Sequence, residues 1–338
     1  MDLPSANRHL AAGKDLSRED MQSVMTLIMS GEATDAQIGS FLTALMIKGE
    51  TVDEIAGAAT IMRDLSAKVP TRSEKIVDSV GTGGDGAKLF NVSTASALVA
   101  SAAGAAMAKH GNRAATGNSG SADVLEAAGV NITISPDQVG ECIDQCGVGF
   151  MFAPTHHSAM RFAIGPRKEI GIRTVFTLLG PLTNPADARY QLAGVFSQLW
   201  LKPMAEVYAE LGSIHTLVVS SNDGLDEISI ADDTRVVEYK NGEFSEYVIG
   251  PEQFGIGKAD LSAITVTDSK GSLDMINRAL GGETGPAADM IALNAGATIY
   301  AGDLVETLED GVARAQEILR DGSALQKLAH LVKVSNSF

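Results

Sequence analysis

A glycine-rich segment constrains the fold of this chain more than any other feature. The sequence GTGGDG occupies residues 81–86, after a strand-like run at 75–80 and before a run of small residues, typical of a helix, that opens near Asn91. Glycines let backbone N–H groups approach an anion closely, and a helix N-terminus adds partial positive charge. The pattern therefore predicts an anion-binding turn between a strand and a helix.

Two similar turns follow close behind. A second strand-like run ends in KHGNR at residues 109–113, and GNSGS occupies residues 117–121. Alternation of strand, glycine turn and helix is typical of a parallel sheet, and ligands bind such sheets outside the carboxyl ends of the strands. Three turns of this kind predict a site for a ligand with more than one phosphate.

From residue 75 onward the expected fold class is α/β, with a mostly parallel central sheet flanked by helices. The candidate strands are 75–80, 104–109, 130–134, 148–152, 191–197, 214–220 and 235–239. Asn241-Gly242 predicts a hairpin that pairs 236–239 with 244–248. Ser135-Pro136 predicts a helix that ends at Gly147, and further helices are expected near 200–212, 271–281, 286–296 and 305–321.

Residues 1–70 carry helical patterns only. Apolar residues recur at helical spacing after capping signals at Ser17, Thr34 and Thr51. Three short amphipathic helices make a poor core, so we expect them to pack on a later part of the chain or on a second subunit. Residues 155–187, rich in His, Arg, Gly and Pro, are predicted to form an inserted helical or loop segment between strands.

The chain is acidic, with 26 basic and 42 acidic side chains among 338 residues and a net charge of −16. Such a surface repels nucleic acid and anionic membranes, so neither is an expected partner. A phosphorylated ligand then requires a local positive site. The cations near the glycine-rich turns are Lys109, His110, Arg113, Arg167, Lys168 and Arg173.

Cellular location is predicted mainly from what the sequence lacks. No apolar run reaches the roughly 20 residues that span a bilayer, and the N-terminus has no signal-peptide pattern. Cys142 and Cys146 cannot build a disulfide framework, and with Val139 and Ile143 they share the apolar face of a helix. These features favour a cytoplasmic protein with two thiols in its core.

The glycine segment matches two other phosphate-binding patterns incompletely. Residues 81–86 fit the G-x-G-x-x-G fingerprint of dinucleotide-binding folds, but such folds need an acidic residue where this chain has Lys109-His110. The Walker pattern needs a lysine directly after its last glycine, and Lys88 comes one place late. An NAD-dependent oxidoreductase is therefore disfavoured, whereas a structural turn without a ligand stays open.

Polar side chains surround the predicted phosphate site. Asn91, Ser93 and Thr94 either cap the following helix, which Ser93 can do alone, or hold a phosphate together with the helix amides. Lys109 and Asn112 either contact the ligand or lie in a solvated turn. The density of such groups favours the ligand in both cases.

An acidic segment, DGLDE at residues 223–227, follows the strand-like run 214–219. Carboxylates at the end of a strand suit Mg²⁺, which takes one or two of them and bridges to phosphates. In isolation this pattern is typical of an ordinary acidic loop. Beside the predicted phosphate site, however, a Mg²⁺ site is favoured. His156 and His157 have no third metal ligand in their pattern, so we expect them to pack or to line a pocket.

Together these motifs resemble the anthranilate phosphoribosyltransferase family of tryptophan biosynthesis. The motifs are GTGGD (81–85), FNVST (90–94), KHGNR (109–113), SGSAD (119–123), GPR (165–167), LGPLTNP (179–185) and DGLDE (223–227). The resemblance covers nearly the whole chain and implies the architecture of nucleoside phosphorylases and related phosphoribosyltransferases. It implies a small helical domain of residues 1–70, joined by part of 155–187, and a large α/β domain of residues 71–338. The large domain would bind phosphoribosyl pyrophosphate (PRPP), and the helical domain would form a homodimer.

The resemblance also implies the reaction and its residues. The phosphoribosyl group of PRPP would pass to the amine of anthranilate, with Mg²⁺ as cofactor and pyrophosphate as the leaving group. The PRPP contacts carried over by position are Gly81, Gly84, Asp85, Asn91, Val92, Ser93, Thr94, Lys109, His110, Gly111, Asn112, Arg113 and Ser121. The anthranilate contacts are Gly81, Asn112 and Arg167, and the Mg²⁺ ligands are Ser93, Asp226 and Glu227. The catalytic residues carried over are Lys109, His110 and Asp85.

Three positions depart from the family pattern. Leu89 stands where a polar residue is usual, Asn118 where a lysine is usual, and Thr177 where an asparagine is common. Loss of a lysine contact to a polyphosphate predicts weaker PRPP binding, by about 1–3 kcal/mol.

Two rival functions remain open. A nucleoside phosphorylase shares the architecture but needs no pyrophosphate-bridging metal, so the Asp226-Glu227 pair disfavours it. A non-catalytic paralogue that binds nucleic acid is disfavoured by the net charge and by the same acidic pair.

Overall fold

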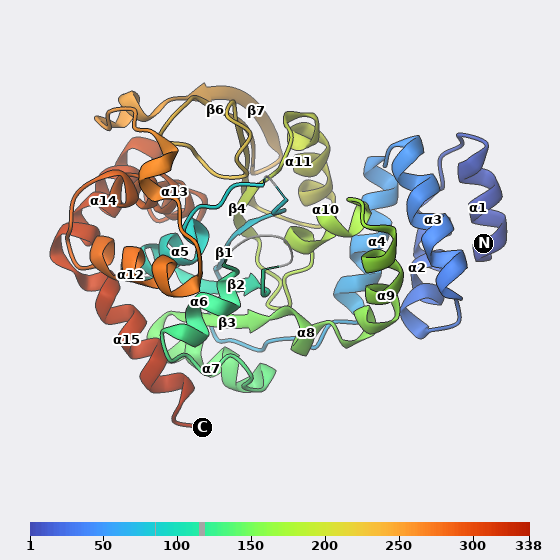
Figure 1. The fold of residues 1–338 in the computed structure, drawn as a ribbon, viewed down its shortest axis with the longest axis horizontal. Coiled ribbons are helices and arrows are strands. Elements are labelled where there is room, and N and C mark those ends of the chain that lie inside the picture. Colours follow the sequence, from blue (N-terminus) through green and yellow to red (C-terminus); the bar gives the residue numbers. More distant parts are fainter. Residues whose placement is uncertain (85, 115–118) are drawn as a thin grey trace.

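A mostly parallel sheet lies at the centre of the molecule in the computed structural model, which describes residues 1–84, 86–114 and 119–338 (Figure 1). Its strands are β1 (Ile76–Gly81), β2 (Ala106–Gly111), β3 (Val148–Phe152), β4 (Tyr190–Gly194), β5 (His215–Ser221), β6 (Thr234–Lys240) and β7 (Glu243–Ile249). Their spatial order is β3-β2-β1-β4-β5-β6-β7. The pairs from β3 to β5 are parallel, and β6 and β7 add antiparallel pairs at one edge. The predicted α/β class with a mostly parallel sheet is confirmed.

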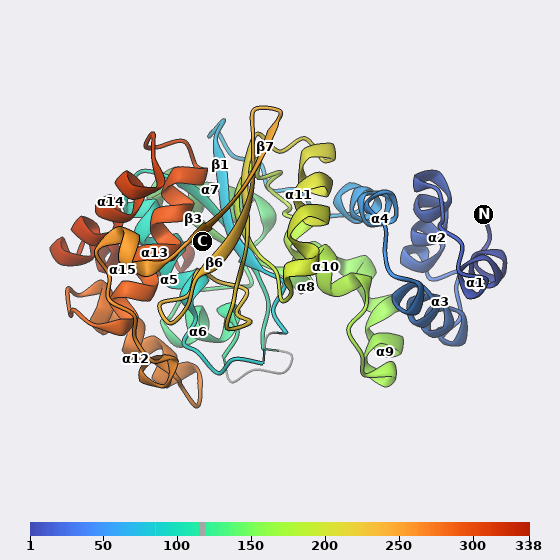
Figure 2. The ribbon, with the colours of Figure 1, turned by 90° about the horizontal axis from the view of Figure 1, so that it is seen from above.

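Helices cover both faces of this sheet and continue beyond one of them. They are α1 (Leu3–Ala11), α2 (Arg18–Ser30), α3 (Asp35–Lys48), α4 (Val52–Asp64), α5 (Val92–Ala102), α6 (Ser121–Ala127), α7 (Pro136–Cys146), α8 (Ala153–His156), α9 (Arg161–Ile170), α10 (Val175–Leu182), α11 (Leu201–Glu210), α12 (Ser269–Leu280), α13 (Pro286–Ala301), α14 (Leu308–Asp321) and α15 (Ser323–Ser335). Figure 2 shows α13 and α14 on one side of the strands and α10 and α11 on the other, with α1 to α3 farthest away. Every helix in the described part of the chain is too short or too polar to span a bilayer.

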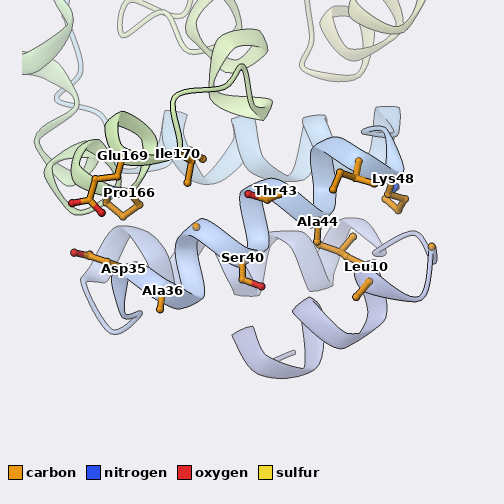
Figure 3. Close-up of a pocket in the computed structure, with 14 residues that line it drawn as sticks. Leu10, Asp35, Ala36, Ser40, Thr43, Ala44, Lys48, Pro166, Glu169 and Ile170 are labelled. Atoms are coloured by element: carbon orange, nitrogen blue, oxygen red, sulfur yellow. The ribbon is translucent and has the colours of Figure 1, made fainter.

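A hollow of about 930 Å³ lies on the outer surface of the N-terminal helices, between α1, α3 and α9. Figure 3 shows Leu10, Ala44, Pro166 and Ile170 around it. Ile47, which also lines the hollow, is 75% exposed. The helices therefore present an apolar surface to the outside as well as to the core.

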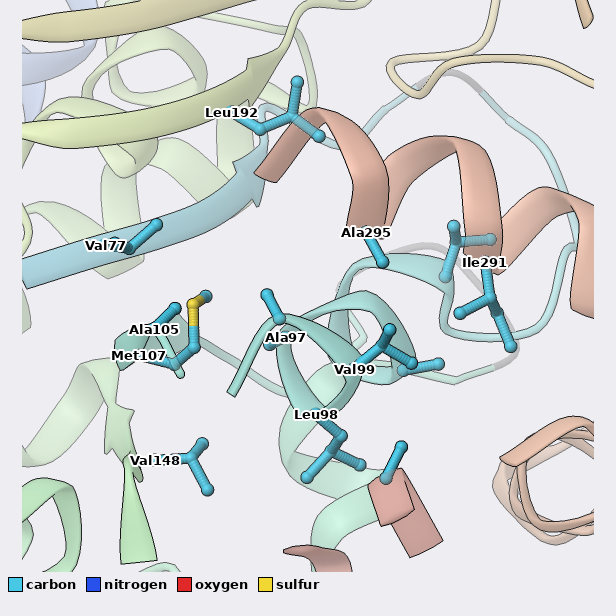
Figure 4. Close-up of a cluster of buried hydrophobic side chains, with 14 of the residues drawn as sticks. Val77, Ala97, Leu98, Val99, Ala105, Met107, Val148, Leu192, Ile291 and Ala295 are labelled. Carbon is cyan, nitrogen blue, oxygen red and sulfur yellow. The ribbon is translucent and has the colours of Figure 1, made fainter. Parts of the chain in front are cut away.

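Alternate residues of the strands serve two separate hydrophobic cores. Leu192 of β4 lies in the first core with Ile291 of α13, as Figure 4 shows. The next residue of β4, Ala193, lies in the second core, and Val218 of β5 joins it there. The sheet is therefore buried on both faces, as parallel sheets generally are.

The second core continues from the sheet into the N-terminal helices. Phe41 of α3 and Met21 of α2 belong to the same cluster as Phe176 and Leu179 of α10. Helix α9 packs on α3, and α10 packs on α4. The first helices thus bury their apolar faces against a later part of the chain. This was expected, because three short amphipathic helices form a poor core by themselves.

Several local predictions agree with the structure. Thr34 and Thr51 form capping boxes at the starts of α3 and α4. Asn241 and Gly242 adopt positive φ values of 51° and 95° in the turn between β6 and β7, which is the predicted hairpin. Cys142 and Cys146 are free and buried on α7.

The strand predicted at 130–134 is wrong, because this segment forms turns instead. Val130, Ile132 and Ile134 are buried. The alternation of apolar residues therefore reflects burial of these side chains and does not indicate pairing in a sheet. Asn131 explains the turn, since its side chain accepts hydrogen bonds from the backbone and hydroxyl of Thr133. Helices α6 and α15 were not among the predicted elements.

Candidate functional site

A cavity of about 430 Å³ opens where the carboxyl ends of β1 and β2 meet the N-terminus of α5. Predicted site residues that line it are Gly81, Gly84, Asn91, Val92, Ser93, Lys109, His110, Gly111, Asn112, Arg113, Ser121, Asp226 and Glu227. Asp85 and Asn118 lie outside the described residues. Although smaller than the hollow between α1, α3 and α9, this cavity gathers glycine backbone, a buried lysine and two carboxylates.

The glycine segment is held from the neighbouring strands. The Thr82 N–H donates to Gly194 O at 3.0 Å, and the Thr82 hydroxyl accepts from the Phe196 N–H at 3.0 Å. The Gly83 N–H donates to Asp226 Oδ2 at 2.6 Å. Gly83 and Gly84 have φ values of 66° and 80°, a region that favours glycine. Contacts within the protein therefore set the shape of residues 82–84.

Two glycines make room for Asp226. A Cβ atom at Gly194 would lie 1.6 Å from the Asp226 carbonyl oxygen, and one at Gly81 would lie 2.3 Å from Asp226 Oδ2. Asp226 can therefore pass over the end of β4 only because both positions lack a side chain. Sequence reasoning missed Gly194. A glycine within a strand pattern often marks a place where another backbone segment approaches closely, and this could have identified it.

The N-terminus of α5 is capped by Asn91. Its side-chain oxygen accepts the Thr94 N–H at 3.3 Å and also the Thr94 hydroxyl. Capping by Ser93, one of the predicted alternatives, is wrong, because the helix begins at Val92 and Ser93 lies inside its first turn. The Ser93 side chain lines the cavity, whereas Thr94 is buried behind the cap.

Lys109 lies almost fully buried at the cavity, with 4% of its surface exposed. Its Nζ donates to the carbonyl oxygen of His110 at 2.9 Å. Burial lowers the pKa of Lys109, and the negative charges of Asp78, Glu227 and Asp226 oppose that shift. The ammonium group is thus held among carboxylates at the end of β2.

Two buried polar side chains behind the cavity wall, Asp78 and Asn184, hold Lys109 in place. Asp78 Oδ2 accepts from Asn184 Nδ2 at 2.7 Å, and Asn184 also donates to Ala108 O at 2.9 Å. Burial raises the pKa of Asp78, while Lys109 and the Asn184 hydrogen bond oppose the rise. Sequence reasoning missed the part played by Asp78, although a carboxylate within an apolar parallel strand was a usable signal.

The ring of His110, which lines the cavity, contacts the ring of His157 at a tilt of 59°, with the ring centroids 5.1 Å apart. Burial lowers the pKa of His110 well below its usual value, and repulsion from His157 and Lys109 adds to the effect. Burial, with a contribution from His156, lowers the pKa of His157 to about 4. Both rings are therefore neutral at pH 7. In the described structure the Nε2 atoms of His110 and His157 are buried without a hydrogen-bond partner.

The other predicted ligands fall into two groups. Asp226, 8% exposed, and half-buried Glu227 share the cavity wall with Ser93, and oxygen donors of this kind are the ligands that Mg²⁺ prefers. Asp223 instead accepts hydrogen bonds from the Ser221 and Ser229 hydroxyls and shapes its own loop.

Within the described residues no group of three or more His, Cys, Asp or Glu side chains could hold a metal by itself. His156 packs against Ala67 O through Nδ1, as expected for a packing residue.

Two predicted cations are engaged elsewhere. The Arg113 guanidinium pairs with Asp123 at 3.1 Å and Glu126 at 2.7 Å, although the residue lines the cavity. Arg167 does not line the cavity; its guanidinium stacks on the Phe176 ring at 4.8 Å from the centroid. The structure therefore does not bring Arg167 onto the cavity wall with Asn112 and Gly81, because α9 packs on α3.

The departures from the family pattern lie in different surroundings. Leu89 lines the cavity, and its backbone forms an isolated bridge with Thr265. Thr177 is half-buried on α10.

Comparisons with known proteins agree with this geometry. The α/β domain model of the glycosyl transferase family matches residues 73–325, and its helical bundle domain model matches residues 4–66. The chain is 54% identical to an anthranilate phosphoribosyltransferase of Thioalkalivibrio sulfidiphilus, over all of both chains.

Solved structures show the same fold. The anthranilate phosphoribosyltransferase of Thermus thermophilus superposes with a TM-score of 0.93 at 43% identity, covering 98% of this chain and 99% of that one. The enzyme of Saccharomyces cerevisiae in complex with PRPP and Mg superposes with a TM-score of 0.91 at 28% identity, covering 99% and 98%. The same yeast enzyme in complex with 4-fluoroanthranilate gives a TM-score of 0.89 at 27% identity, with the same coverage. Agreement of this extent in sequence and fold, around a cavity built from the family's motifs, means that the chain belongs to the anthranilate phosphoribosyltransferase family.

Proposed function

We propose that this chain transfers the phosphoribosyl group of PRPP to the amine of anthranilate, releasing pyrophosphate, as a step of tryptophan biosynthesis. One observation carries the proposal. The cavity joins a glycine segment, a helix N-terminus, a buried lysine and two carboxylates at the carboxyl ends of parallel strands. The names of the relatives and the PRPP, Mg and 4-fluoroanthranilate complexes of the yeast enzyme support it.

In this proposal the pyrophosphate of PRPP lies against the glycine segment and the first turn of α5. Backbone N–H groups and the partial positive charge of the helix bind it there. Lys109 supplies the neighbouring full positive charge. Asp226, Glu227 and Ser93 would hold Mg²⁺, which when bound offsets the charge of the pyrophosphate. Opposite charges would therefore bind the pyrophosphate, and the backbone N–H groups would set its orientation.

The chemistry requires little acid–base assistance at its start. The aromatic amine of anthranilate is neutral at pH 7, so its lone pair can form the N–C bond as the C–O bond to pyrophosphate breaks. The negative charge that leaves on pyrophosphate is stabilised by fixed positive groups, above all Lys109. We propose that neutral His110, which lines the cavity, accepts the proton that the amine loses afterwards.

The anthranilate roles of Gly81, Asn112 and Arg167 remain part of the proposal. Gly81 and Asn112 line the cavity already. Arg167 would contribute a carboxylate contact after α9 approaches the cavity, since Arg binds carboxylates through two parallel hydrogen bonds.

We propose the remaining features on separate grounds. A helical domain of residues 1–70 with part of 155–187, and an α/β domain of residues 71–338, is supported by the separate family models that match residues 4–66 and 73–325 and by the packing of α9 on α3. A homodimer through the helical domain is supported by the apolar hollow between α1, α3 and α9. A cytoplasmic location is supported by the two free, buried cysteines.

The test follows the loss of anthranilate fluorescence when the protein is mixed with PRPP and Mg²⁺, with controls that omit each component. Loss that requires both substrates and the metal supports the proposal. Unchanged fluorescence with well-folded protein contradicts it, and phosphate-dependent cleavage of a nucleoside would then identify a phosphorylase.

A further inference from the structure

We propose that Arg173 is a positioning residue for PRPP. It holds the carbonyl oxygen of Gly84 and so fixes residues 81–84, the described start of the glycine segment. The inference rests on the proposed function, because it assigns the segment to pyrophosphate. Arg173 belongs to the connection between α9 and α10, far from the glycine segment in sequence. It does not line the cavity itself.

The contact between the two segments is direct. Arg173 Nη2 donates to Gly84 O at 2.7 Å. A Cβ atom at Gly84 would lie 3.4 Å from Arg173 Nε, so the arginine side chain packs closely against this glycine. The contact therefore combines a charge-assisted hydrogen bond with close packing that suits a residue without a side chain.

A second contact fixes Arg173 itself. Its guanidinium lies 4.7 Å from the centroid of the Phe196 ring, in cation–π geometry. The N–H of Phe196 donates to the hydroxyl of Thr82 at 3.0 Å. Phe196 thus supports both Thr82 and, through Arg173, Gly84, so the glycine segment is clamped at two of its residues.

The clamp matters because a carbonyl oxygen repels phosphate. Gly84 lines the cavity, and its carbonyl group carries partial negative charge. The hydrogen bond directs that oxygen to Arg173, which is not part of the wall. Among the described residues no carboxylate forms an ion pair with the Arg173 guanidinium, whereas Arg113 pairs with Asp123 and Glu126.

The contact also links two parts of the fold. Arg173 lies between α9, which packs on α3, and α10, which packs on α4. The glycine segment continues β1 at the centre of the sheet. Movement of the α9–α10 connection would therefore release the Gly84 carbonyl, and ligand-binding geometry depends on where that connection lies.

The experiment compares the wild type with Arg173→Ala, Arg173→Lys and the control Arg161→Ala. Arg161 is a matched control because it also stacks on a phenylalanine, Phe162 at 4.4 Å, and donates to a carbonyl, Ser158 O, but lies away from the cavity. Each protein is assayed for KM with both substrates and titrated with pyrophosphate and Mg²⁺ by calorimetry. Thermal unfolding checks that each variant is folded.

Arg173→Ala is expected to raise the KM for PRPP and the Kd for pyrophosphate by about 3- to 10-fold, the range for losing a solvent-exposed hydrogen bond. The KM for anthranilate should change much less. Arg173→Lys should recover part of the loss, because lysine still donates to the carbonyl, and Arg161→Ala should match the wild type.

Arg173→Gln separates positioning from the effect of charge. Its amide can still donate to Gly84 O but carries no charge, so it should recover part of the pyrophosphate affinity that Arg173→Ala loses. A Kd for Arg173→Gln equal to that of Arg173→Ala would mean that the charge acts on the anion itself and would overturn the inference. An unchanged pyrophosphate Kd, or an equal rise in both KM values, would overturn it as well. If the wild type neither turns over nor binds pyrophosphate, the proposed function fails instead.

Discussion

At the scale of single residues, the cavity depends on buried polar groups that do not line it. Lys109 is held over Asp78, and Asp78 is held by Asn184, which bridges to Ala108 O. Buried carboxylates need such partners because an unsatisfied charged group keeps its full desolvation cost. The position of the lysine is thus determined by residues one layer beneath it.

Asn184→Ala is therefore expected to lower the free energy of unfolding by about 2–3 kcal/mol, since it removes one donor from a buried carboxylate. Chemical denaturation measures this change. Asn336→Ala is the control, because Asn336 donates to Gly129 O at 2.8 Å from an exposed position and should cost less than about 0.5 kcal/mol. Equal losses in the two variants would contradict the role given to Asn184.

At the scale of elements, a second polar cluster joins β5, β6, β7 and α13 away from the cavity. His215 on β5 lies 2.9 Å from Glu238 on β6 and 2.7 Å from Asp303, just after α13. Tyr247 of β7 and Tyr300 of α13 each donate to Glu238 at 2.8 Å. One carboxylate thus ties the antiparallel edge of the sheet to the helix that covers it.

This cluster makes stability depend on pH with a defined sign. Burial alone would raise the pKa of Glu238, but hydrogen bonds from His215, Tyr247 and Tyr300 outweigh it and lower the pKa. The folded state then holds its proton less tightly than the unfolded state, whose pKa is about 4.3. The stabilisation is complete above that value and is lost as pH falls through the lower folded pKa.

Glu238→Gln should remove this part of the acid dependence. Denaturation at pH values from about 6 to about 3 should show a shallower loss of stability for the variant than for the wild type. Glu246→Gln, on the exposed face of β7, should follow the wild-type curve. Parallel curves for Glu238→Gln and the wild type would contradict the assignment.

At the scale of the whole molecule, the N-terminal helices have two apolar surfaces and only one of them faces the core. The inner surface joins the second hydrophobic core, and the outer one forms the hollow between α1, α3 and α9. Large exposed apolar patches on soluble proteins commonly mark interaction sites. A second copy of the chain is the occupant that the proposed homodimer requires.

Ile47→Glu is expected to convert the dimer to a monomer, because it places a charge at the 75% exposed apolar position beside the hollow. Light scattering at several concentrations measures the mass. Leu199→Glu is the control, since Leu199 is 84% exposed but lies outside the hollow, and it should stay dimeric. A wild-type mass equal to one chain would contradict the homodimer.

Much of the fold and part of the site could be predicted from sequence because their determinants are local. Capping boxes at Thr34 and Thr51, the turn at Asn241-Gly242 and the alternation along the strands depend on residues a few positions apart. The cavity-lining motifs were also recognisable, since strand ends in a parallel sheet share one edge. Where the local pattern had two outcomes, as at 130–134, the prediction was wrong.

Local sequence patterns are enough to predict the α/β class, most helix caps and the polar groups at the strand ends. Long-range packing selects which distant groups meet: Asp226 with Gly83, 143 residues apart, and Arg173 with Gly84, 89 residues apart. It also decided that Arg167 stacks on Phe176 and does not line the cavity. The physical reason is that turn and helix preferences act within a few residues, whereas these contacts depend on how strands and helices pack. A glycine such as Gly194 has no local meaning until Asp226 passes over it.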